Sequence, residues 1–210
     1  MTIFTAYTAA TSDDGSGTED MNFDNTSTTM ALGYDSTAIE KYQIWGRFPN
    51  VTVPQGSTVL GADFRVEVNA DPGLDGFSVT VKGIDADNAS APTDETELVG
   101  GSSEPTLTSA SDTAVLSNGE TDAIELSDLN IGCTTVIQEI LNRPGWSSGN
   151  AIVIFATYSG DEAEDEIVNF RTYDYTGTTY TPILRINYTA PAGADAVPMA
   201  LNTYQQMRNM

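Results

Sequence analysis

The sequence contains no histidine and a single cysteine, Cys133. Histidine is the commonest general base and the commonest metal ligand in proteins, so this chain lacks the usual centre of a catalytic or metal site. One cysteine cannot form an intramolecular disulfide, and Cys133 lies beside an apolar helical pattern, so we expect it to be a small core residue. The chain also has no nucleophile motif, and any choice of a carboxylate pair would be arbitrary. We therefore predict that the protein is not an enzyme.

Basic residues are scarce, with 8 Lys and Arg against 30 Asp and Glu and a net charge of −22. A chain with so few cations has little to neutralise phosphate groups, which excludes nucleic acid and anionic membrane as expected partners. The negative charge favours solubility and repulsion between free copies. It also favours divalent cations or a basic protein surface as partners.

Long apolar runs are missing as well, and none approaches the length that spans a membrane. The first residues, MTIFTAYTAATSDDGSG, have neither a basic region nor an apolar stretch of the kind found in signal peptides. We therefore expect the chain to be made in a cytoplasm and to leave it, if at all, by lysis or another route without a signal peptide.

The stretch Gly132–Ser159 predicts one short helix followed by one buried strand. Apolar residues at helical spacing predict a helix over about residues 133–142 with one apolar face, and Pro144 cannot continue it. The unbroken apolar run Ala151–Ala156 has the length of a strand and is typical of one buried on both faces. Between them the chain turns sharply, which predicts that Trp146 packs against the helix carrying Ile137 and Leu141.

The rest of the chain predicts an all-β sandwich or jelly roll. Short alternating segments separated by turn residues recur along it, a pattern typical of such folds. Residues 12–19 and 85–111 are polar and rich in turn-forming residues, and they are expected to be loops. The expected strands are 2–7, 29–34, 40–48, 58–69, 77–84, 113–116, 123–126, 151–156, 167–175 and 182–188.

Three segments resemble one known family. They are VIQEILNRPGWSSGNA (residues 136–151), YQIWGRFPNVTVPQGSTVLGADFRVEV (residues 42–68) and YTPILRINY (residues 180–188). Together they are similar to a jelly-roll module of the DNRLRE, carbohydrate-binding-module-like type, found in bacterial surface proteins and in structural proteins of tailed phages. The resemblance covers roughly residues 20–189. It implies a jelly-roll fold without catalytic residues and a role in carbohydrate binding or in virion or cell-surface architecture.

The composition changes after Tyr188, which divides the chain into a sandwich of residues 1–189 and an arm of residues 190–210. The arm carries only two charges, Asp195 and Arg208, and shows no strand pattern. Disordered tails are normally polar and charged, whereas this one has large apolar residues with no core of their own. We expect it to dock on a partner subunit through Val197, Met199, Leu201, Tyr204 and Met207.

Two other kinds of site are candidates. Asp85, Asp87 and Asn88 offer oxygen ligands suited to calcium, although the segment lacks the glycine and distal glutamate of an EF-hand. No other cofactor is expected. Aromatic platforms for a sugar would be Tyr34, Tyr158 or, as a cluster, Tyr173, Tyr175 and Tyr180, and that cluster could equally be a hairpin packing on itself. Trp45 and Trp146 lie within apolar patterns and are expected in the core.

Two functions remain open from the sequence. The first is a virion structural protein, a phage capsid decoration or cement protein that binds the major capsid protein or other virion subunits and is oligomeric on the particle. The alternative is a carbohydrate-binding module of a tail fibre or bacterial surface protein.

Overall fold

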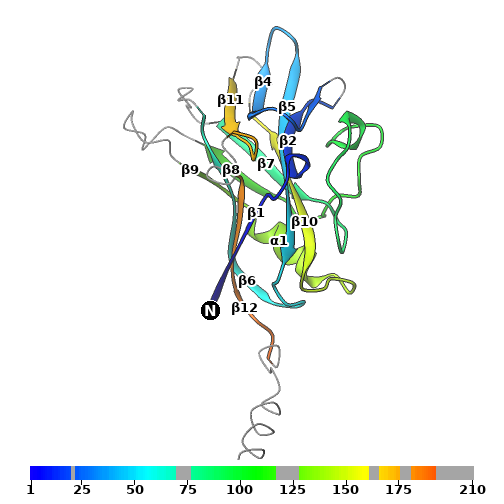
Figure 1. The fold of residues 1–210 in the computed structure, drawn as a ribbon, viewed down its shortest axis with the longest axis vertical. Helices are drawn as coiled ribbons and strands as arrows, with labels where there is room; N and C mark the ends of the chain where they lie inside the picture. Colours follow the sequence, from blue (N-terminus) through cyan, green and yellow to red (C-terminus); the bar gives the residue numbers. More distant parts are fainter. Residues whose placement is uncertain (20–21, 70–76, 117–127, 161–165, 176–180, 193–210) are drawn as a thin grey trace, which may run out of the picture.

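Two antiparallel sheets pack face to face in the computed structural model, which describes residues 1–19, 22–69, 77–116, 128–160, 166–175 and 181–192 (Figure 1). The smaller sheet has four strands, which in spatial order are β1 (Thr2–Tyr7), β12 (Ile183–Thr189), β6 (Thr58–Glu67) and β9 (Asp128–Gly132). The first and last strands of the chain are therefore neighbours.

The larger sheet has eight strands. Its main path is β11 (Glu166–Arg171), β4 (Thr29–Asp35), β5 (Glu40–Val51), β10 (Asn150–Tyr158), β7 (Phe77–Gly83) and β8 (Asp112–Leu116). The remaining two strands are β2 (Asp14–Gly17), which pairs with β5, and β3 (Phe23–Asp24), which pairs with β2. The prediction of an all-β sandwich with one short helix is confirmed.

The main core lies between the two sheets. Inward side chains of both sheets alternate with outward ones, as expected for strands buried on one face. Phe48 of the larger sheet meets Phe64 of the smaller one edge to face, with ring centroids 5.8 Å apart, and both side chains are fully buried. Leu184 and Ile186 of β12 belong to the same core.

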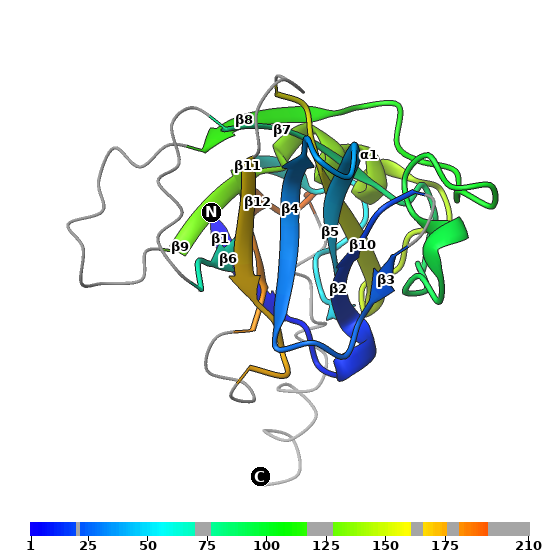
Figure 2. The same ribbon diagram turned by 90° about the horizontal axis from the view of Figure 1, so that it is seen from above.

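The middle strands β5 and β10 are buried on both faces, which confirms for β10 the prediction made from the apolar run Ala151–Ala156. Trp45, Val153 and Phe155 point to the outer face of the larger sheet, where they form a second core with Leu98 and Ala89. Both of these partners come from residues 85–111, the segment expected to be a loop. Figure 2 shows this segment on the far side of β5 and β10 from β6 and β12. It is therefore a third layer of the fold, although its regular secondary structure is limited to one short 3₁₀ turn, Glu95–Glu97, and a β-bridge from Leu107 to Ile84.

The helix α1 (Thr134–Asn142) spans the residues expected, with Val136, Ile137, Ile140 and Leu141 buried. It begins after Cys133, which is fully buried in the main core and whose side chain forms no capping hydrogen bond. Asp112 of β8 supplies the cap, because its Oδ2 accepts hydrogen bonds from the backbone N–H groups of Thr135 and Val136 at 2.8 and 3.2 Å.

The expectation of a loop over residues 12–19 is wrong. After a 3₁₀ turn, Thr11–Asp13, the sequence Asp14–Gly17 forms the buried strand β2. A Cβ at Gly15 would lie 2.4 Å from the carbonyl oxygen of Asp24, and one at Gly17 would lie 2.1 Å from that of Asn22. Glycine is required at both positions because the backbones approach closely. The same glycines give the segment the composition of a loop, and this is why the prediction from sequence was wrong.

Trp146 is buried as predicted. Its side chain is 3% exposed, belongs to the same core as Ile137 and Leu141, and donates a hydrogen bond from Nε1 to the carbonyl oxygen of Val53 at 3.0 Å. The indole thereby ties the turn after α1 to the chain beyond β5.

Trp146→Ala should lower the free energy of unfolding by about 3–5 kcal/mol, because it removes a large buried side chain and leaves a cavity. Urea unfolding of the variant and of the wild type measures the difference. Trp146→Phe keeps most of the volume and should cost less. A loss below about 1 kcal/mol for the alanine variant would show that Trp146 does not support the core.

Candidate functional site

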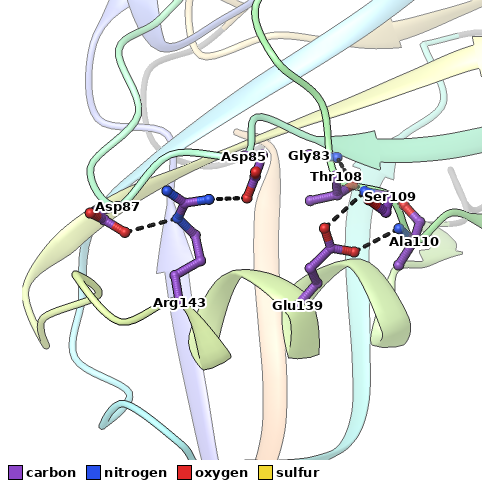
Figure 3. Close-up of polar contacts among 8 residues, drawn as sticks. All are labelled: Gly83, Asp85, Asp87, Thr108, Ser109, Ala110, Glu139 and Arg143. Carbon is purple, nitrogen blue, oxygen red and sulfur yellow. Dashed lines mark hydrogen bonds and ion pairs between the residues drawn. The ribbon is translucent and has the colours of Figure 1, made fainter.

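The residues predicted to bind calcium are engaged with a cation of the protein itself (Figure 3). Arg143, just after α1, forms ion pairs with both Asp85 and Asp87, the latter with Nε 2.8 Å from Oδ1. The third candidate, Asn88, accepts a hydrogen bond from the N–H of Ala151 at 2.7 Å. A calcium ion would have to displace the guanidinium group to use these oxygens. The described residues contain no group of three or more His, Cys, Asp or Glu side chains arranged to hold a metal ion.

Arg143 and Glu139 anchor opposite ends of the third layer to α1. Glu139, one turn earlier, accepts hydrogen bonds from the N–H groups of Ser109 and Ala110 at 2.8 and 2.6 Å (Figure 3). Arg143 thus holds the start of segment 85–111 and Glu139 holds its end. The two ends also bond to each other, because Asp85 N–H donates to Thr106 O at 2.8 Å and Thr108 N–H donates to Gly83 O at 2.8 Å.

The ion pairs give both carboxylates a cationic partner within the protein. The hydrogen bonds that Arg143 donates to Asp85 and Asp87 raise the pKa of its guanidinium group, which keeps it charged at any ordinary pH. The arrangement closes a long loop at its base and leaves its interior free to carry Leu98 and Ala89 onto the sheet. We assign these residues a structural role.

A second polar cluster lies where the N-terminal segment meets the turn after β11. Asp14, at the start of β2, is fully buried, and its Oδ2 accepts hydrogen bonds from Thr8 Oγ1 and from the N–H of Tyr173, both at 2.9 Å. Asp174 Oδ1 accepts from Thr11 Oγ1 at 2.9 Å. The hydroxyl groups of Thr8 and Thr181 also hydrogen-bond to each other. The cluster therefore joins three segments that are far apart in the sequence.

Two carboxylate oxygens in this cluster, Asp14 Oδ1 and Asp174 Oδ2, are buried and have no hydrogen-bond partner among the described residues. The pKa of Asp14 is raised to about 7, chiefly by burial and also by the nearby charges of Asp174 and Asp13, against the lowering effect of the hydrogen bonds from Tyr173 and Thr8. Asp13 itself is neutralised by Arg47, with Nη1 2.9 Å from Oδ1. Because Asp14 is sealed from solvent, it is a buried acid that a substrate could not reach, and nothing in the sequence marked it.

The candidate sugar-binding tyrosines divide into three groups. Tyr34 and Tyr158 are buried and stack on each other with ring centroids 6.3 Å apart, so they are not accessible platforms. Tyr173 and Tyr175 are half-buried on the turn after β11, and the guanidinium carbon of Arg171 lies 4.3 Å from the centroid of the Tyr175 ring. Tyr180 lies outside the described residues. The structure therefore places two of the three clustered tyrosines on one turn, with one face of Tyr175 already covered.

The five residues expected to dock on a partner, Val197, Met199, Leu201, Tyr204 and Met207, lie outside the described residues. Within the described part, the chain is placed as far as Ala192, three residues beyond the end of β12.

No family model matches the chain, and no curated protein matches it. Within the described ranges, no helix has the length and apolar character needed to cross a membrane.

The variant Asp14→Asn tests whether the buried carboxyl group of Asp14 has a raised pKa. A pKa raised to about 7 in the folded state means that the folded protein holds this proton more tightly than the unfolded chain does. The resulting stability is fully present below about pH 4 and is lost as the pH rises through about 7. Between pH 4.5 and pH 8.5 the free energy of unfolding of the variant should therefore gain about 2–4 kcal/mol relative to the wild type.

Urea unfolding at the two pH values measures this change. Glu104→Gln, at an exposed carboxylate, is the matched control and should show almost no such change. An Asp14→Asn variant whose stability difference from the wild type is the same at both pH values would contradict the assignment.

Proposed function

We propose that the protein is a non-enzymatic structural protein of a virus particle, which attaches to the assembled capsid as a decoration or cement protein. The observation that carries the proposal is the composition of residues 190–210. This segment has one acid and one base in a chain of net charge −22, and it carries five large apolar residues. Such a segment is suited to binding a preformed groove on another protein.

The surroundings of the carboxylates described above support a non-enzymatic role. Asp85 and Asp87 both pair with Arg143, and Asp14 is buried. The chain has no histidine. The carboxylates form hydrogen bonds and ion pairs within the protein, and these contacts stabilise the sandwich. Such a role suits a protein that functions through its binding surfaces. The resemblance of residues 20–189 to modules of phage structural proteins points the same way.

Carbohydrate binding is the second candidate function. It is favoured by the position of Tyr173 and Tyr175, half-buried on one turn beside the carboxylate of Asp174. Sugar sites commonly combine an aromatic face with polar groups that fix orientation. Glycan binding by the body alone, lost in Tyr173→Ala and kept in Tyr173→Phe, would favour this function over the first.

Removal of residues 190–210 tests the main proposal. Each apolar anchor contributes about 1.5–3 kcal/mol when buried, less the cost of ordering the segment, so its loss should sharply reduce occupancy on purified particles. Quantitative mass spectrometry of gradient-purified particles measures the occupancy. A chain with Val197, Met199, Leu201, Tyr204 and Met207 all replaced by serine keeps the length and should behave like the deletion.

The control is the unfolding midpoint of each variant, which should match that of the full chain. Absence of the protein from particles, or full occupancy by a folded body without the arm, would overturn the proposal.

A further inference from the structure

Strand β1 differs from every other edge strand among the described residues because it carries no charge. The edge strands β3, β8, β9 and β11 each contain at least one acid, namely Asp24, Asp112, Asp128 and Glu166. The sequence of β1, Thr-Ile-Phe-Thr-Ala-Tyr, also contains neither proline nor glycine. Proteins normally protect an edge strand with a charge, a proline or a bulge, because its free N–H and C=O groups invite another strand. None of these devices is present in β1.

The hydrogen bonds of β1 show which groups are free. Thr8 N–H donates to Pro182 O at 3.2 Å, and the register pairs Ala6 with Leu184 and Phe4 with Ile186. Hydrogen-bonded and non-bonded pairs alternate along an antiparallel ladder. The even-numbered residues of β1 therefore bond to β12, and the N–H and C=O groups of Ile3, Thr5 and Tyr7 point away from it. In the described part of the chain no strand pairs with this side of β1.

The side chains at these three positions are exposed, and two of them are large and hydrophobic. Ile3 is 62% exposed and Tyr7 is 52% exposed, on the outer face of the smaller sheet. The charges beside them are balanced, because Arg185 of β12 pairs with Asp63 of β6 at 2.7 Å. On a protein of charge −22, this edge is a place where two copies can meet with little local repulsion.

We propose that β1 pairs with β1 of a second copy of this chain. The two strands run antiparallel about a two-fold axis at Thr5, so that the two smaller sheets become one continuous sheet. Thr5 then faces Thr5 of the second copy, and Ile3 faces Tyr7 of the second copy on both sides of the axis. These three pairs use the N–H and C=O groups that β1 leaves free, and each pair exchanges two hydrogen bonds. The two outer pairs each bring an aliphatic and an aromatic side chain together.

A symmetric contact of this kind closes on itself and yields a dimer, because each copy offers one such edge. The contact is short, so we expect a dissociation constant in the micromolar range or weaker. Salt should tighten it, because screening reduces the repulsion between the two acidic bodies. The proposal is independent of where the protein attaches, since residues 190–210 take no part in it.

Sedimentation velocity of the full chain without a terminal tag, from about 1 to 500 µM protein and in about 0.15 and 0.5 M salt, tests the proposal. The wild type should show a concentration-dependent dimer. Thr5→Pro should weaken it by about 30-fold, because each dimer loses two N–H donors. The fold should tolerate proline at this position, since the N–H of Thr5 does not bond to β12. A wild type that stays monomeric throughout, or a dimer unchanged in folded Thr5→Pro, would overturn the proposal.

A pair of charge variants tests the register and does not depend on proline. Ile3→Glu with Tyr7→Glu places like charges opposite each other and should abolish the dimer. Ile3→Lys with Tyr7→Glu places opposite charges at both outer pairs and should restore it. Ile39→Glu changes a side chain that is 76% exposed in the β4–β5 turn, and it should leave the dimer unchanged. Equal dimerisation of the two double variants would exclude the proposed pairing.

Discussion

The burial of both faces of the β5–β10 pair is the constraint on which the rest of the structure depends. A sheet strand that is apolar on one face needs one covering layer, whereas Trp45, Val153 and Phe155 require a second layer on the outside. Residues 85–111 provide that layer, and Arg143 and Glu139 hold its two ends on α1 (Figure 3). The helix therefore has two functions: its apolar face closes the main core and its polar side chains position the outer layer. Gln138 links the helix to the start of β6, since its Oε1 accepts a hydrogen bond from the N–H of Val59 and its Nε2 donates one to the carbonyl oxygen of Ser57.

The few basic residues of this acidic chain also act at specific contacts between segments. Arg47, Arg143, Arg171 and Arg185 each pair with an acid, and all four pairs join different strands or loops. The few cations therefore stabilise specific junctions and leave most acids on the surface, where they repel other copies. Asp14 is the exception, because it is buried without a cation and accepts hydrogen bonds from Thr8 and Tyr173 instead. Strand β1 differs from this acidic surface because it carries no charge.

The sequence predicted the parts of the fold that local periodicity determines. The alternation in β6 and β7, the apolar run in β10 and the stripe of α1 each identify an element and its buried face. Prediction from the sequence failed where the structure of one segment depends on contacts with a distant segment. The strand at Asp14–Gly17 needs glycines because two backbones meet, Asp112 caps a helix from another strand, and Leu98 is a core residue only because Trp45 and Phe155 face outward. For the same reason the sequence did not predict that Asp85 and Asp87 pair with Arg143, which lies more than 50 residues away.

The central claim is that residues 85–111 are a layer of the hydrophobic core, although they contain almost no regular secondary structure. Leu98, which is fully buried in that layer, provides the most direct test. Equilibrium unfolding of Leu98→Ala should show a loss of about 2–5 kcal/mol, as for a leucine in the interior of a sheet, with Val115→Ala as an exposed control that changes little. A loss below about 0.5 kcal/mol for Leu98→Ala would place the segment among ordinary surface loops and contradict the account.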